Sequence, residues 1–144
     1  MDNWTPIAGA ETPRILIADD EQDIAEALRF CLEQEGCEVQ VATNGHEALG
    51  AIRAWKPHVA LLDVMMPREN GYRVSRFAKE DVDRGLIPPL TILLVTARKL
   101  DDTEREQTFA EFSRCDGVVY KPFDLEELLS LVREHAVNRI LQPA

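Results

Sequence analysis

Residues 14–21 read RILIADDE, an apolar run that ends in three acidic residues. A short, uninterrupted apolar run of this kind is typical of a strand that is buried on both faces of a parallel sheet. The run TILLV at 91–95 has the same character. Each run is followed by polar residues and then by a segment with apolar residues at three-to-four spacing. This pattern predicts an alternation of strands and helices.

The alternation extends from Arg14 almost to the end of the chain. We expect strands at residues 14–18, 38–41, 58–62, 90–95 and 117–120. We expect helices at residues 23–35, 46–54, 72–81, 103–112 and 125–138. Capping pairs support two helix starts, Asn44 with Glu47 and Asp124 with Glu127, and Gly36 fits a helix end. The expected fold class is α/β: a doubly wound three-layer sandwich with helices on both faces of a five-stranded parallel sheet.

The length and composition favour one globular domain. The chain has 144 residues, and we assign 1–13 to an N-terminal extension, 14–138 to the domain and 139–144 to a C-terminal tail. A net charge of −10, with 26 acidic against 16 basic residues, argues against direct nucleic-acid binding. The apolar runs are too short to span a membrane. Three cysteines without metal-ligand spacing are expected to be structural thiols of a cytoplasmic protein.

Polar and reactive residues follow the strands where the strands end. The first strand leads into Asp19 and Asp20, the third into Asp63, the fourth into Thr96 and the fifth into Lys121. Ligands of open parallel sheets bind outside the carboxyl ends of the strands, so these side chains should share one site.

Three carboxylates in a partly buried pocket repel one another, and a hard divalent cation such as Mg²⁺ would neutralise them. Taken singly, each feature has a simpler explanation. Asp19 and Asp20 could cap a helix, Lys121 could belong to an ordinary loop, and Thr96 could bond to backbone. Their convergence on one edge of one sheet favours a metal-dependent site.

Four motifs, in this order, resemble those of the receiver domains of bacterial two-component response regulators, of the chemotaxis-regulator type. They are ILIADDE at 15–21, ALLDVMMP at 60–67, LLVTA at 93–97 and YKPF at 120–123. The resemblance covers about residues 14–138 and implies a flavodoxin-like (βα)5 fold with strand order 2-1-3-4-5.

The resemblance implies roles for particular residues. Asp63 would be the phosphoacceptor, Thr96 would bond a phosphoryl oxygen after transfer, and Lys121 would bridge Asp63 and then the phosphoryl group. The implied ligands of Mg²⁺, or of Mn²⁺, are Asp20, Asp63, the backbone carbonyl of Met65 and, largely through water, Asp19. The Lys121–Pro122 peptide would be cis, as in the family.

This sequence departs from the family pattern beside the lysine. Val118 stands three residues before Lys121, where the family usually has an aromatic switch residue, whereas Tyr120 lies next to the lysine. Tyr120 could pack as a half-buried residue or take part in the switch. The stretches 79–89 and 98–115 also look longer than usual in the family.

The resemblance implies a phosphorylation-switched signalling domain rather than an enzyme that turns over a substrate. The phosphodonor would be a sensor histidine kinase or a histidine phosphotransfer protein. A downstream protein would bind the face formed by the fourth helix, fifth strand and fifth helix, and a homodimer is left open. A Mg²⁺-dependent phosphohydrolase would need a second acid two residues after Asp63, where Met65 stands. A degenerate receiver that signals without phosphate would not need the acidic residues, Thr96 and Lys121.

Overall fold

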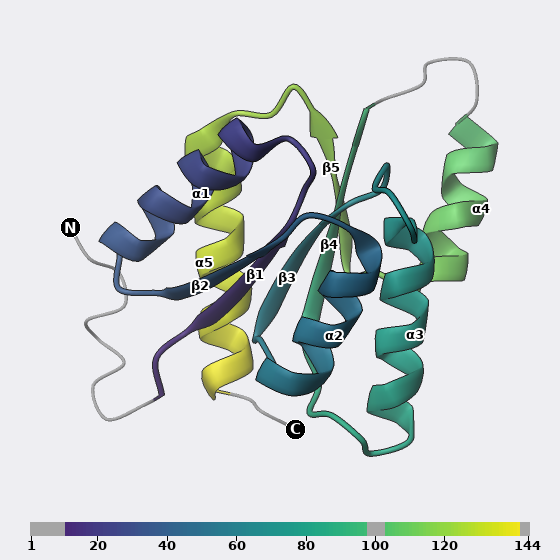
Figure 1. The fold of residues 1–144 in the computed structure, drawn as a ribbon, viewed down its shortest axis with the longest axis horizontal. Helices are drawn as coiled ribbons and strands as arrows, with labels where there is room; N and C mark the ends of the chain where they lie inside the picture. The colour runs from purple at the N-terminus through teal and green to yellow at the C-terminus, as the bar shows by residue number, and fades with distance from the viewer. Residues whose placement is uncertain (1–10, 98–102, 142–144) are drawn as a thin grey trace.

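The computed structural model describes residues 11–97 and 103–141, and strands and helices alternate along the chain (Figure 1). The strands are β1 (Arg14–Ala18), β2 (Glu38–Ala42), β3 (Val59–Asp63), β4 (Thr91–Ala97) and β5 (Gly117–Lys121). The helices are α1 (Gln22–Gln34), α2 (Gly45–Trp55), α3 (Gly71–Asp83), α4 (Thr103–Ser113) and α5 (Leu125–Leu141). Most of the expected extension, residues 1–10, lies outside the described residues.

The strands form one parallel sheet in the order β2-β1-β3-β4-β5. Helices α1 and α5 cover one face of this sheet, and α2, α3 and α4 lie on the other side (Figure 1). The doubly wound α/β sandwich and its strand order are therefore confirmed. Strand order reverses between β1 and β3, which places the ends of these two strands beside the crevice where such sheets bind ligands.

Strand β1 shows why its sequence is apolar throughout. Ile15 and Ile17 join the core between the sheet and helices α1 and α5, whereas Leu16 and Ala18 join the core beneath α2 and α3. All four side chains are at most 1% exposed. Because successive side chains of a strand point to opposite faces, a strand covered on both faces must be apolar at every position.

The capping residues act as the sequence indicated. The side chain of Asn44 accepts a hydrogen bond from the backbone N–H of Glu47 (2.8 Å), and that of Asp124 accepts one from Glu127 (3.1 Å). Gly36 lies just beyond α1 with a φ of 98°, a conformation that a residue without Cβ adopts at little cost.

Several element boundaries differ from the sequence prediction. Strand β3 ends at Asp63, β4 continues to Ala97 and β5 continues to Lys121, so Asp63, Thr96 and Lys121 are strand residues and not loop residues. Strand pairing continues this far because adjacent strands remain in register, with Thr96 beside Tyr120. Helix α5 ends at Leu141 and not at residue 138, and the guanidinium of Arg139 donates to the hydroxyl of Thr91 (3.0 Å) in this last turn.

Candidate functional site

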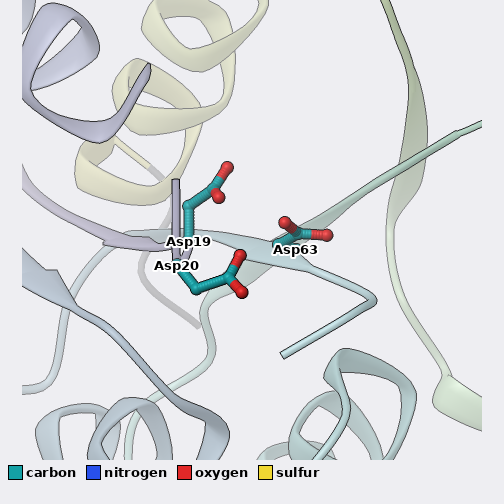
Figure 2. Close-up of side chains that lie close together, drawn as sticks. All are labelled: Asp19, Asp20 and Asp63. Carbon is teal, nitrogen blue, oxygen red and sulfur yellow. The ribbon is translucent and has the colours of Figure 1, made fainter. Parts of the chain in front are cut away.

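Three aspartates meet at the carboxyl ends of β1 and β3. Asp19 and Asp20 follow β1, and Asp63 is the last residue of β3. The two strands pair in register up to Ala18 and Leu62, so Asp19 and Asp63 are the next positions on each. One carboxylate oxygen from each aspartate lies within 4.8 Å of the others (Figure 2). The predicted convergence of these three residues is what the structure shows.

The carboxylate of Asp63 is buried and held by two donors. Its residue exposure is 5%. One oxygen accepts a hydrogen bond from the backbone N–H of Met65 (3.1 Å), and the other accepts one from the ammonium group of Lys121 (3.2 Å). The side chain is thereby fixed at the rim of the sheet. The Met65 side chain is 73% exposed, so it is the backbone of this residue that faces the site.

A glycine keeps the loop after Asp63 close to helix α3. The backbone N–H of Gly71 donates to the carbonyl of Val64 (3.1 Å). A Cβ atom at position 71 would lie 2.6 Å from the carbonyl oxygen of Asp63, which is too close for any larger residue without a shift of backbone. The start of α3 therefore packs directly against the end of β3.

The surroundings of the Asp19 carboxyl group raise its pKa. Burial and the negative charge of Asp63 raise its pKa to about 6, although the backbone N–H of Glu21 donates to it (2.8 Å) and favours the charged form. Asp20, by contrast, is exposed. Crowded carboxylates that resist ionisation are relieved by a cation, and all the converging groups are hard oxygen donors. The cluster could therefore hold a divalent metal ion.

Lys121 brings a positive charge to the cluster from the end of β5. Its ammonium nitrogen lies 2.7 Å from a carboxylate oxygen of Glu21, 3.2 Å from Asp63 and 3.6 Å from Asp19. Burial disfavours its charge, but hydrogen bonds to Glu21 and Asp63 and the nearby carboxylates raise the pKa of Lys121. The group stays protonated at any physiological pH. The expected cis Lys121–Pro122 peptide is present.

Sequence reasoning singled out Asp19 and Asp20 but gave Glu21 no role. The sequence did contain a signal, because Glu21 is the third acidic residue of the ADDE motif and follows the same strand as Asp19 and Asp20. It was missed because an exposed Glu at a helix start usually needs no explanation beyond the helix dipole.

Thr96 lies near the end of β4, next to Val95, which pairs with Asp63, and it faces a cavity that residues of α4 also line. It lines a cavity of about 160 Å³ together with Tyr72, Val118 and Tyr120. Its hydroxyl lies 3.5 Å from the carbonyl of Ala97. Val118 and Tyr120, where the chain departs from the family pattern, therefore line the same cavity as Thr96. Arg98, two positions beyond Thr96, lies outside the described residues.

Comparison with known proteins identifies the family. The model of the response regulator receiver domain matches residues 15–133. The chain therefore belongs to the response regulator receiver domain family, the receiver domains of two-component systems. Response regulator MprA of Mycolicibacterium vanbaalenii is 39% identical over 120 residues, which cover 83% of this chain and 48% of that protein. The chain spans about half the length of the curated relatives it matches.

Solved structures agree with this assignment. The receiver domain of the Francisella response regulator 1452 has a TM-score of 0.75 and 28% identity, covering 88% of this chain and 98% of that one. A CheY-like receiver domain protein from Methanospirillum hungatei has a TM-score of 0.77 and 26% identity, covering 90% of this chain and 97% of that one. Across residues 11–97 and 103–141, no helix combines the length and apolar character needed to cross a membrane.

Proposed function

We propose that Asp63 accepts a phosphoryl group and that the chain signals through the change that follows. The observation that carries this proposal is the placement of the Asp63 carboxylate. It is buried, one oxygen is held by the Met65 N–H, the other contacts the ammonium of Lys121, and two further carboxylates lie beside it. This is a nucleophile with a backbone donor and one positive charge already in position, and phosphoryl transfer depends mainly on such positioning and charge neutralisation.

The transfer step needs no further covalent group. An oxygen of Asp63 attacks the phosphorus of the donor, a phosphorus–oxygen bond forms, and the bond to the leaving group breaks with its electron pair on that group. Lys121 neutralises negative charge that spreads over the phosphoryl oxygens. Thr96 would bond one of these oxygens after transfer. Later attack of water on the phosphorus releases inorganic phosphate and restores the Asp63 carboxylate.

The acidic cluster is proposed to bind Mg²⁺, or Mn²⁺ in its place. Asp20 and Asp63 would be direct ligands with the backbone carbonyl of Met65, and Asp19 would act largely through water. These are the oxygen donors that such ions prefer, and added positive charge would favour the ionised form of Asp19, whose pKa is raised in its absence. When bound, the ion would neutralise charge on the phosphoryl group and orient it for in-line transfer.

The chain is proposed to be a signalling domain that turns over no external substrate. Its donor would be a sensor histidine kinase or a histidine phosphotransfer protein, since the relatives it matches are response regulators. The net charge of −10 supports action through protein contacts and not through direct nucleic-acid binding. We place the receiver unit at residues 14–138 of a cytoplasmic protein, with the α4–β5–α5 face as its contact for a downstream protein or a second copy.

Acetyl phosphate provides the test. Wild type should gain one labile phosphoryl group per chain, seen by intact mass, only when Mg²⁺ is present. Asp63→Asn, which preserves shape but removes the nucleophile, should gain none. Equal labelling of this variant would show that another residue is the acceptor. Continuous release of phosphate at an enzymatic rate would instead indicate a phosphohydrolase.

A further inference from the structure

Glu21 stands at the N-cap of α1 but does not use its side chain as a cap. Its backbone has the extended conformation of an N-cap residue, and the side chain makes no hydrogen bond to the first turn of the helix. Residues at this position usually cap the free amides of the helix. The carboxylate of Glu21 instead reaches Lys121, one hundred residues away in the sequence, at 2.7 Å.

Because of this contact, the ammonium group of Lys121 donates hydrogen bonds to two carboxylates, those of Glu21 and Asp63. The distance from the nitrogen to Glu21 (2.7 Å) is shorter than the distance to Asp63 (3.2 Å). Lys121 is mostly buried, with 19% of its side chain exposed, whereas 55% of the Glu21 side chain is exposed. Glu21 therefore competes with Asp63 for the ammonium group of Lys121.

We propose that Glu21 is a positioning residue that restrains phosphorylation by holding Lys121 in the unphosphorylated state. The inference rests on the proposed function of Asp63. Transfer to Asp63 adds negative oxygens that compete with Glu21 for the ammonium group, so Lys121 must leave Glu21 to neutralise them. Glu21 also adds one negative charge that repels an anionic donor. Both effects oppose phosphorylation. When a neutral amide replaces the carboxylate, the repulsion of the donor is lost and the hold on the ammonium group is weakened.

A purely structural role for Glu21 leads to a different expectation. A partly exposed ion pair contributes little to stability, so its loss should leave folding and phosphorylation almost unchanged. The two roles predict different kinetics of phosphorylation but the same fold. Three variants separate them: Glu21→Gln, Glu21→Asp and Asp23→Asn.

Each variant changes one property. Glu21→Gln removes both the charge and the ion pair. Glu21→Asp keeps the charge, but its shorter side chain favours capping of α1 and is expected to lose the contact with Lys121. Asp23→Asn removes an exposed negative charge from the same helix turn and leaves the contact between Glu21 and Lys121 intact. Circular dichroism should first show that all three are folded.

The experiment measures the rate of phosphorylation against acetyl phosphate concentration, with Mg²⁺ saturating for each variant. For Glu21→Gln, the maximal rate divided by the half-saturating concentration should rise roughly three- to tenfold, and added salt should reduce the gain. Glu21→Asp should show most of this rise. Asp23→Asn should change by less than about twofold, because exposed charges are screened.

Two outcomes would overturn the inference. Wild-type kinetics for Glu21→Gln would show that the contact does not restrain the lysine. An equal rise for Asp23→Asn, with none for Glu21→Asp, would assign the effect to charge alone. Failure of the proposed function is a separate result, because wild type would then gain no phosphoryl group or Asp63→Asn would still be labelled.

Discussion

The ring of Tyr72, at the start of α3, stacks on the ring of Phe109 in α4, with their centroids 5.2 Å apart and their planes at 24°. Tyr72 follows Gly71, which packs directly against the carbonyl of Asp63. Two further contacts join α3 to the C-terminal end of α4 and the residue that follows it. The hydroxyl of Ser75 donates to the carbonyl of Ser113 (2.8 Å), and Arg114 pairs with Asp83 (2.6 Å). Helix α4 is therefore attached to α3, the helix that begins beside Asp63, the proposed phosphoacceptor.

The aromatic stack should contribute measurably to stability. We expect Tyr72→Ala and Phe109→Ala each to lower the free energy of unfolding, with a coupling between them of about 0.5–1.5 kcal/mol in a double-mutant cycle. Denaturant unfolding of the two single variants and the double variant measures this coupling. Phe30→Ala, at a side chain that is 64% exposed, is the control and should change stability by less than about 0.5 kcal/mol. Strictly additive effects of the two substitutions would show that the rings do not stabilise each other.

Asp116 should stabilise the entry to β5 through a backbone hydrogen bond. Its carboxylate accepts from the backbone N–H of buried Ile92 (2.7 Å) and from the ammonium of Lys79 (2.7 Å). Asp116→Ala leaves both donors without this acceptor, and we expect a loss of about 1–3 kcal/mol in the free energy of unfolding. Asp116→Asn keeps an acceptor for Ile92 and should lose clearly less. Equal losses in the two variants by chemical denaturation would argue against the backbone bond as the cause.

Most of the fold could be predicted from the sequence because it depends on local patterns. Continuous apolar runs, such as residues 14–18, indicated strands covered on both faces, and the polar residues that follow them located the site at one edge. Boundaries were less exact, since Asp63 and Lys121 extend their strands through pairing with neighbours. Such pairing depends on residues that are distant in the sequence.

Side-chain contacts between residues that are distant in the sequence could not be predicted. The sequence does not say that the Glu21 side chain leaves its own helix for Lys121, because capping and ion pairing are both open to an acid at that position. Nor does it pair Tyr72 with Phe109, whose contact depends on how α4 lies against α3. Helix periodicity indicates which face is apolar but not which ring it meets.

Magnesium should stabilise the folded chain. An ion that binds only the folded state raises the free energy of unfolding by about 2.7 kcal/mol at one hundred times its dissociation constant. We expect the unfolding midpoint to rise in MgCl₂ relative to EDTA with KCl at matched ionic strength. Asp20→Ala should abolish most of this rise and cost little in EDTA, because Asp20 is exposed. An unchanged response to Mg²⁺ in this variant would exclude Asp20 as a direct ligand.

Asp19→Asn should increase stability without metal and reduce the gain from Mg²⁺. The raised pKa of Asp19, to about 6, shows that its charged form is disfavoured in the fold, chiefly by burial and then by Asp63. An asparagine oxygen can still accept from the Glu21 N–H, which lies 2.8 Å from the present carboxylate. At pH 7.5 in EDTA we expect the free energy of unfolding to rise by about 1–2 kcal/mol.

Chemical denaturation of wild type, Asp19→Asn and Asp23→Asn measures this effect. Asp23→Asn removes an equal but exposed charge from the start of α1, so it should be neutral or slightly destabilising. In saturating Mg²⁺ the order should reverse, with wild type more stable than Asp19→Asn, because the ion then neutralises the carboxylates that repel one another in its absence. If Asp19→Asn were less stable than wild type in EDTA, the ion pair with Lys121, at 3.6 Å, would outweigh the repulsion from Asp63. The cluster would then be balanced without a metal, and the case for a cation at this edge of the sheet would lose its electrostatic basis.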